Sequence, residues 1–127
     1  MSRVALAEGA DTDPVFGSLP GEFPAFQWHG DTFDLPDGAV WLAGNGAYRH
    51  QAFRVGSAYG LQFHVEVDTA LAGEWLEIPA YAAGLQAVHG PGSADRVLGE
   101  LTGEVATTLA LGRRLFEAWL DTYVLPQ

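Results

Sequence analysis

The chain has 127 residues, of which 16 are acidic and 6 are arginine, with no lysine, no cysteine and a net charge of −10. So acidic a surface disfavours nucleic-acid binding, and without lysine or cysteine these residues offer no Schiff base, disulfide, thiolate metal ligand or cysteine nucleophile. The hydrophobic fraction of 48% is enough for one core of ordinary size. No apolar run approaches the ~18 residues of a membrane span, and the first residues are too short an apolar run for a signal peptide, so we expect a cytoplasmic protein without a membrane anchor.

The first half of the chain predicts short strands separated by turns. Residues 13–20 favour at most one helical turn, because Pro20 ends it. The aromatic residues of 26–33 favour a strand, and close spacing favours antiparallel pairs over parallel crossovers, which need a dozen or more residues. The predicted strands cover residues 3–8, 23–33, 39–43, 51–55 and 59–68.

The second half predicts helices. Asp68 or Thr69 can cap a helix that runs to about Glu77, residues 80–89 are compatible with a second helix, and Ser93 can cap a long third one. Spacing near 3.6 places an apolar stripe on the third helix, typical of a core or partner contact. The stripe consists of Leu98, Leu101, Val105, Leu109, Phe116, Trp119 and Tyr123.

Residues 59–68 hold the candidate chemistry. In a strand, alternation places Leu61, Phe63 and the two following valines on one face, and His64 and Glu66 on the other. Residues two apart on one face lie roughly 6–7 Å apart at Cα, a distance at which a carboxylate can orient an imidazole. The pair therefore has the composition of the base and orienter of a nucleophilic triad.

Three interpretations of this pair stay open on the residues alone. His64 can be a hydrogen-bonded structural histidine at a strand end. It can also be a base oriented by Glu66. Finally, His29 and Asp31 form a second His-x-acid unit, and two such units side by side would make a metal or small-ligand site. No serine lies in a Gly-x-Ser-x-Gly elbow, which disfavours a serine hydrolase.

Four stretches together resemble one known family. Residues 59–66, YGLQFHVE, resemble the G-x-Q-F-H-P-E strand of class I glutamine amidotransferases. Residues 26–36 are similar to the W-x-H-x-D-x-x-x-L-P segment of the GMP-synthase-like branch of that family. Residues 39–45 and 50–56 are similar to its L-A-x-S and x-Q-A-F-x-x-G run. The resemblance covers residues 12–77 in the family order, and more loosely the helical tail.

The resemblance implies a fold as well as a site. The fold class is α/β, a partial flavodoxin-like amidotransferase sheet, with an α+β arrangement inside this fragment: short, mostly antiparallel strands in residues 3–67 and helices in residues 69–123. Residues 1–127 are then a single incomplete domain, the C-terminal half of the family domain. The family's first half, which carries a Gly-x-Cys-x-Gly nucleophile elbow, is missing from these residues.

The resemblance also implies roles for particular residues. His64 would be the general base that activates a cysteine thiol, and Glu66 its orienter. His29 and Asp31 would lie near the substrate. Glutamine is the family substrate, and neither a metal nor another cofactor is implied. The chain departs from the family at Val65, which replaces a proline and can shift the Glu66 carboxylate.

The missing nucleophile limits the activity that we expect. A base and orienter alone give very little rate, so the chain by itself should be inactive. It can be half of a split or truncated enzyme whose companion chain supplies the cysteine, or a non-catalytic interaction or regulatory protein. It can also be a metal-binding or small-ligand-binding protein that uses His29, Asp31, His64 and Glu66. A sheet deprived of its other strands exposes an edge, which favours a companion or a homo-oligomer.

Overall fold

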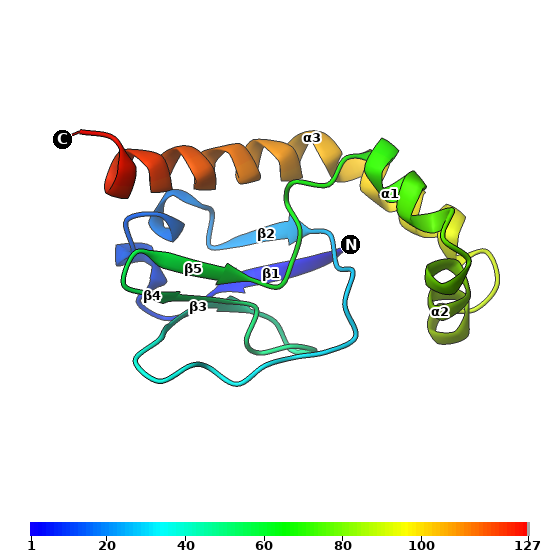
Figure 1. The fold of residues 1–127 in the computed structure, drawn as a ribbon, viewed down its shortest axis with the longest axis horizontal. Coiled ribbons are helices and arrows are strands. Elements are labelled where there is room, and N and C mark those ends of the chain that lie inside the picture. The colour runs from blue at the N-terminus through cyan, green and yellow to red at the C-terminus, as the bar shows by residue number, and fades with distance from the viewer. Residues whose placement is uncertain (127) are drawn as a thin grey trace.

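The structure is a computed structural model that describes residues 1–126. Five short strands form one sheet in the order β2-β1-β3-β4-β5, with antiparallel pairing between all neighbours. Figure 1 shows this sheet on one side of a long helix. The predicted α/β class, with antiparallel strands first and helices after them, is confirmed. The strands are β1 Ser2–Leu6, β2 Glu22–Ala25, β3 Val40–Gly44, β4 Ala52–Val55 and β5 Ala58–Leu61.

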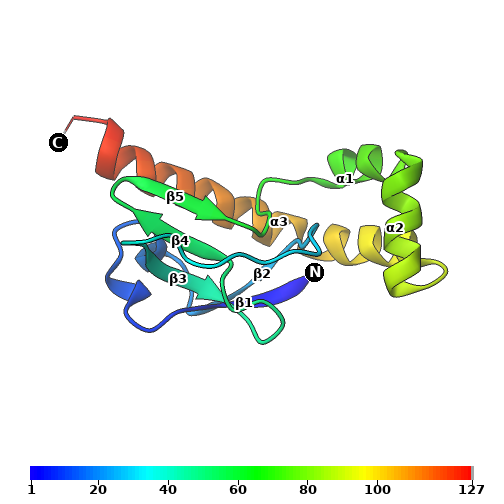
Figure 2. The same ribbon diagram turned by 60° about the horizontal axis from the view of Figure 1, so that its bottom comes forward.

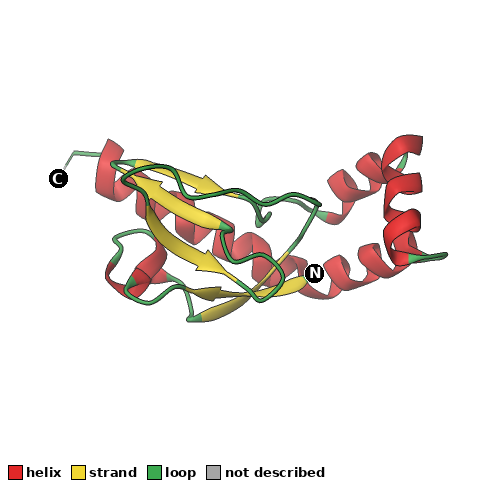
Figure 3. Ribbon diagram, turned by 90° about the horizontal axis from the view of Figure 1, so that it is seen from below, coloured by secondary structure: helices red, strands yellow, loops and turns green. Residues whose placement is uncertain are grey.

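The sheet curls so that its two edge strands meet at one end. Beyond β2 and β5, Phe26 and His64 form an isolated antiparallel bridge. The Phe26 N–H donates to the His64 carbonyl at 2.9 Å, and the His64 N–H donates to the Phe26 carbonyl at 2.8 Å. Because β2 and β5 are the opposite edges of the sheet, this bridge makes it a half-barrel (Figure 3).

Three helices follow the sheet. The first, α1 Thr69–Leu76, is capped by Asp68, whose carboxylate accepts from the Leu71 N–H at 2.8 Å. Next come α2 Pro79–His89 and α3 Ser93–Trp119, and α3 continues into the π-helical turn η3 Leu120–Val124. The predicted helices over 69–77 and 80–89 are confirmed. Two single 3₁₀ turns, η1 Ala10–Thr12 and η2 Phe16–Ser18, lie between β1 and β2.

The long helix α3 joins two hydrophobic clusters. Its C-terminal half lies over the concave side of the sheet, and its N-terminal half runs beyond the sheet to α1 and α2 (Figures 1 and 2). The first cluster fills the half-barrel and includes Phe16, Phe23, Leu42, Phe63 and Leu115. The second lies under α1 and consists of Phe26, Val67, Ala72 and Leu101, with Trp28 and Trp75 packed against it.

The predicted strand over 59–68 is wrong in its second half. The strand β5 ends at Leu61, which is 41% exposed at the sheet edge. The chain then leaves β4 to reach the bridge with Phe26, so it crosses the mouth of the half-barrel instead of extending the ladder. Alternation nevertheless survives: Phe63, Val65 and Val67 are buried, whereas the residues between them reach the surface. The periodic pattern therefore located the buried face from Phe63 onward without a regular strand, whereas Leu61, predicted on the same face, is exposed.

Two other expectations are corrected. The aromatic residues after Phe26 make no ladder, because β2 ends at Ala25 and no other described strand lies beside residues 27–33. The long helix is capped by Gly92 without any side-chain bond, and Ser93 is its first residue. The buried positions of α3 are Ser93, Leu101, Thr108, Leu111 and Leu115, so Leu109 and Phe116 of the predicted stripe are exposed.

No helix among residues 1–126 combines the length and the apolar content that crossing a membrane requires.

Candidate functional site

His64 and Glu66 form a hydrogen-bonded pair at the mouth of the half-barrel. His64 Nδ1 lies 2.6 Å from Glu66 Oε1, and Glu66 Oε2 accepts from the Val65 backbone N–H at 3.0 Å. The His64 side chain is 27% exposed and the Glu66 side chain 64%. Both carboxylate oxygens of Glu66 are therefore engaged, which holds the carboxylate in place at the surface.

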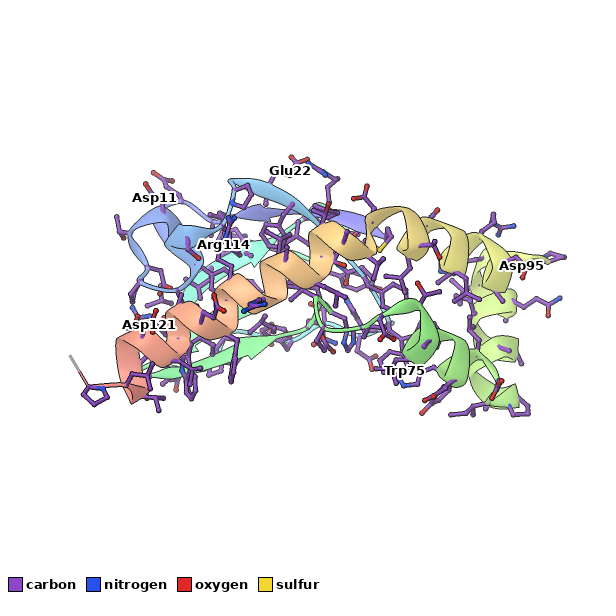
Figure 4. All side chains as sticks on the ribbon, turned by 90° about the horizontal axis from the view of Figure 1, so that it is seen from above. Asp11, Glu22, Trp75, Asp95, Arg114 and Asp121 are labelled. Carbon is purple, nitrogen blue, oxygen red and sulfur yellow. The ribbon has the colours of Figure 1, made fainter. Side chains whose placement is uncertain are left out.

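The surroundings fix the imidazole ring. The bridge to Phe26 anchors the His64 backbone, and Trp75 of α1, labelled in Figure 4, packs edge-on against the ring at a centroid distance of 5.6 Å. The neighbouring side chains of Phe63 and Val65 belong to the cluster inside the half-barrel, and Val67 belongs to the cluster under α1. His64 thus lies where the two cores meet, and both of them hold its backbone.

This geometry leaves one ring nitrogen for chemistry. An ionised carboxylate only accepts hydrogen bonds, so the neutral imidazole carries its proton on Nδ1 and has a lone pair on Nε2. Within residues 1–126, His64 Nε2 has no hydrogen-bond partner. A ring held in this tautomer, with Nε2 open, can accept a proton from a nucleophile brought to it.

His29 and Asp31 lie in a separate hydrogen-bond system. His29 Nδ1 contacts the Asp31 backbone carbonyl, and His29 Nε2 contacts Gln27 Oε1. The Gln27 amide donates to Gln51, whose own amide donates to the Tyr48 carbonyl. This relay ties the His29 loop to the sheet. The Asp31 side chain is exposed, and no described contact joins His29 or Asp31 to His64 or Glu66.

The structure gives no support to a metal centre built from these residues. Within residues 1–126, no three His, Asp or Glu side chains lie close enough together to hold an ion. Both ring nitrogens of His29 already have partners, so a metal would have to displace one of them. The alternative of a cluster of two histidines and two carboxylates is therefore not assembled among the described residues.

An apolar groove begins at Glu66. It has a volume of about 530 Å³ and lies between β5 and the C-terminal half of α3. Its walls include Leu61, Leu109 and Phe116, which are 41%, 38% and 60% exposed. On its open side β5 pairs with no other described strand. Apolar side chains beside a free strand edge are typical of an interaction surface.

A buried polar cluster at the other end of the sheet was missed in the sequence. The Asp13 carboxylate accepts from two backbone N–H groups in the following turn, from Arg54 Nε at 2.8 Å and from the Tyr59 hydroxyl at 3.0 Å. Tyr59 in turn lies 3.2 Å from the Tyr123 hydroxyl. The hydrogen bond to Asp13 raises the pKa of Arg54. Burial, with the bonds to Tyr123 and Asp13, raises the pKa of Tyr59 far above its ordinary value of 10.0.

Comparison with known proteins identifies the fold. No protein-family model and no curated protein matches the chain. The structure of a glutamine amidotransferase from Thermotoga maritima is similar, with a TM-score of 0.80 and 32% identity over 94% of this chain and 49% of that one. A glutamine amidotransferase from Methylobacillus flagellatus has a TM-score of 0.75 and 22% identity over 94% of this chain and 50% of that one. The chain therefore has a glutamine amidotransferase-like fold and spans about half the length of these structures.

Proposed function

We propose that residues 1–127 form a single incomplete class I glutamine amidotransferase domain, the C-terminal half, which supplies the base and orienter of a glutaminase triad. The hydrogen bond between His64 Nδ1 and Glu66 Oε1 carries this proposal, since it leaves Nε2 open within an amidotransferase-like fold. The motif in residues 26–36 favours the GMP-synthase-like branch, and His29 and Asp31 would lie at the substrate side of the site.

The proposed reaction requires a thiol from outside these residues, because the chain contains no cysteine. His64 Nε2 would take the proton of a cysteine thiol, and the thiolate would attack the side-chain amide carbon of glutamine. The nitrogen would leave as ammonia after taking that proton, and water would hydrolyse the thioester to glutamate. In this scheme Glu66 stabilises the imidazolium and keeps the ring oriented.

The cysteine would come from a companion polypeptide equivalent to the part of the similar structures that this chain does not match. The groove beside Glu66 supports this proposal: it combines the free edge of β5 with exposed Leu109 and Phe116, and it reaches the candidate triad. A homo-oligomer would cover the same face without completing the triad. Light scattering of the pure chain distinguishes the two, because a companion-dependent chain self-associates weakly whereas a homo-oligomer keeps its mass on dilution.

A fusion protein tests the activity. The part of the Thermotoga maritima amidotransferase that this chain does not match is joined ahead of residue 1, and ammonia release from glutamine is measured. We expect release by the fusion, and a loss of at least about 100-fold in its His64→Ala variant. The matched control is His89→Ala, which changes an exposed histidine at the end of α2.

Two results would count against the proposal. A folded fusion protein that releases no ammonia, or one that His64→Ala leaves unchanged, would remove the assigned role of the pair. If the unfused chain releases ammonia and His64→Ala abolishes that release, the expectation that the chain is inactive by itself is wrong.

A further inference from the structure

A second cavity lies at the opposite end of the fold from the apolar groove. Its volume is about 740 Å³, and it opens between the end of the sheet, α2 and the first turns of α3. Trp28 and Tyr81 line one part of it, and Ser93 and Arg96 line another. His29 also lines it, but neither His64 nor Glu66 does, so the proposed base and orienter leave the rest of this cavity without a role.

The aromatic wall is held rigidly. Trp28 stacks on Phe26 at a centroid distance of 5.7 Å and packs against Trp75 at 5.5 Å. Tyr81 of α2 meets Trp28 edge-on at 6.2 Å and remains 48% exposed. The two rings stand at 77° to each other and form an apolar corner, in which an aromatic ligand can lie against one ring and meet the other edge-on.

The opposite part of the cavity is formed by the N-terminus of α3 and Arg96. The helix α3 has 27 residues, and Gly92 caps it without a side-chain bond, so the N–H groups of its first turn have no side-chain capping partner among residues 1–126. Arg96 binds the His89 and Pro91 carbonyls at 2.7 and 3.0 Å and has no carboxylate partner among the described residues.

Ser93 is the observation that points to a ligand. The residue is 3% exposed, and its hydroxyl has no hydrogen bond within residues 1–126. No fully enclosed polar side-chain atom of the described residues lacks a partner, so the Ser93 hydroxyl keeps some accessible surface, and Ser93 is one of the residues that line the cavity. A buried hydroxyl that faces a cavity at a helix N-terminus is placed to bind an anion.

Nearby acids do not oppose this assignment. Glu100, which also lines the cavity, lies 3.1 Å from the amino group of Met1. Asp95 in the first turn of α3 is exposed and does not line the cavity. We propose that the cavity binds a small aromatic anion, with its ring against Trp28 and Tyr81 and its carboxylate or phosphate at Ser93 and the first turn of α3.

Titration with phenyl phosphate tests the proposal. The ¹⁵N–¹H NMR signals of the Trp28 indole and of the Ser93 and Ala94 amides are followed, with inorganic phosphate and benzyl alcohol as ligands that carry only one half of the chemistry. We expect phenyl phosphate to shift both sets of signals and to bind roughly tenfold more tightly than either half. Benzoate, titrated in parallel, shows whether the site prefers a carboxylate or a phosphate.

Variants identify the residues responsible. Ser93→Ala and Arg96→Gln should each weaken phenyl phosphate binding by about tenfold. The matched control is Arg114→Gln on the same helix, because Arg114 also donates to a backbone carbonyl, that of Ser18 at 3.0 Å, but far from the cavity (Figure 4). If Arg96→Gln loosens the loop before α3, seen as lost amide dispersion, Ser93→Ala alone decides.

Three outcomes would overturn the proposal. The first is that neither phenyl phosphate nor benzoate shifts the signals at concentrations on the order of 10 mM, which would detect a dissociation constant of about 1 mM. The second is that inorganic phosphate binds as tightly as phenyl phosphate. The third is that Ser93→Ala leaves the affinity for phenyl phosphate unchanged. Loss of ammonia release in the fusion protein would leave this proposal standing, because Trp28, Tyr81 and Ser93 have no part in the proposed glutaminase chemistry.

Discussion

Gly112 of α3 lies directly against the backbone carbonyl of Val65, the residue between the members of the His64–Glu66 pair. A Cβ at position 112 would collide with that carbonyl oxygen and touch the Val65 side chain. The helix backbone is therefore one wall of the segment that carries the candidate base and orienter. The weak helix propensity of glycine, which costs about 1 kcal/mol relative to alanine, is the cost of this close approach.

Gly112→Ala should destabilise the protein. The gain in helix propensity is outweighed by overpacking against Val65, which typically costs about 1–3 kcal/mol. Urea unfolding measures the free energy, and we expect a net loss of about 1 kcal/mol with displaced His64 ring signals in NMR spectra. Gly103→Ala is the control on the same helix, because nothing lies within 4 Å of its added Cβ, and it should stabilise. Equal stabilisation by both substitutions would refute the close contact.

Asp13→Asn should be among the most damaging isosteric changes. The Asp13 carboxylate is 3% exposed and accepts four different donors, including Arg54 and Tyr59. An asparagine loses the charge that pairs with Arg54 and turns an amide group toward donors. We expect a loss of about 2–4 kcal/mol in the free energy of unfolding, measured in urea.

The control for Asp13→Asn is Arg113→Gln, which removes an ion pair on the exposed face of α3. That pair is open to solvent on both sides, so its loss should leave the urea midpoint unchanged. A midpoint in Asp13→Asn that matches the one in Arg113→Gln would show that the cluster does not contribute to stability.

The raised pKa of Tyr59 predicts alkaline instability. Burial, aided by the bonds to Tyr123 and Asp13, keeps Tyr59 protonated in the folded state at a pH where the unfolded chain ionises near 10. Stability is complete below pH 10 and falls as the pH rises above 10, by up to about 1.4 kcal/mol per pH unit. Unfolding at pH 9, 10 and 11 measures this slope. Tyr59→Phe should flatten it, and Tyr81→Phe, at an exposed site, should leave it unchanged.

The sequence predicted the local order of the fold better than its long-range contacts. Strand and helix positions followed from periodicity and caps such as Asp68, which act within a few residues. The end of β5 at Leu61 did not follow, because the bridge between Phe26 and His64 joins segments far apart in the chain. The burial of Thr108 and Leu111 in place of Leu109 likewise depends on how α3 rotates against the half-barrel, which no local pattern states.

The candidate site divides in the same way. Two residues of separation were enough to predict that Glu66 can reach His64, and the distance of 2.6 Å is a local property. The assembly around Asp13 joins residues 41 and 46 positions apart, to Arg54 and Tyr59 respectively, and leaves no periodic signal. The cavity at Ser93 depends on the packing of α2 against α1 and α3, which no local pattern predicts, and the serine alone suggested only a helix cap.

Glu66→Gln separates the orienting role of Glu66 from any role in stability. A carboxylate only accepts, so it requires the His64 proton on Nδ1, whereas a glutamine can turn its amide to donate and move that proton to Nε2. The ring would then lose its open lone pair at the position where a nucleophile must give up a proton. The free energy of unfolding should change by less than about 1 kcal/mol, because the Glu66 side chain is 64% exposed.

Ring ¹⁵N chemical shifts distinguish the two imidazole tautomers directly. In the natural chain we expect His64 Nδ1 to be the protonated nitrogen, and in Glu66→Gln a mixture or the Nε2-protonated form. Glu74→Gln on the exposed side of α1 is the control for charge alone and should leave the ring shifts in place. An Nδ1-protonated ring that persists in Glu66→Gln would mean that packing against Trp75 and the Phe26 bridge, and not the carboxylate, sets the tautomer.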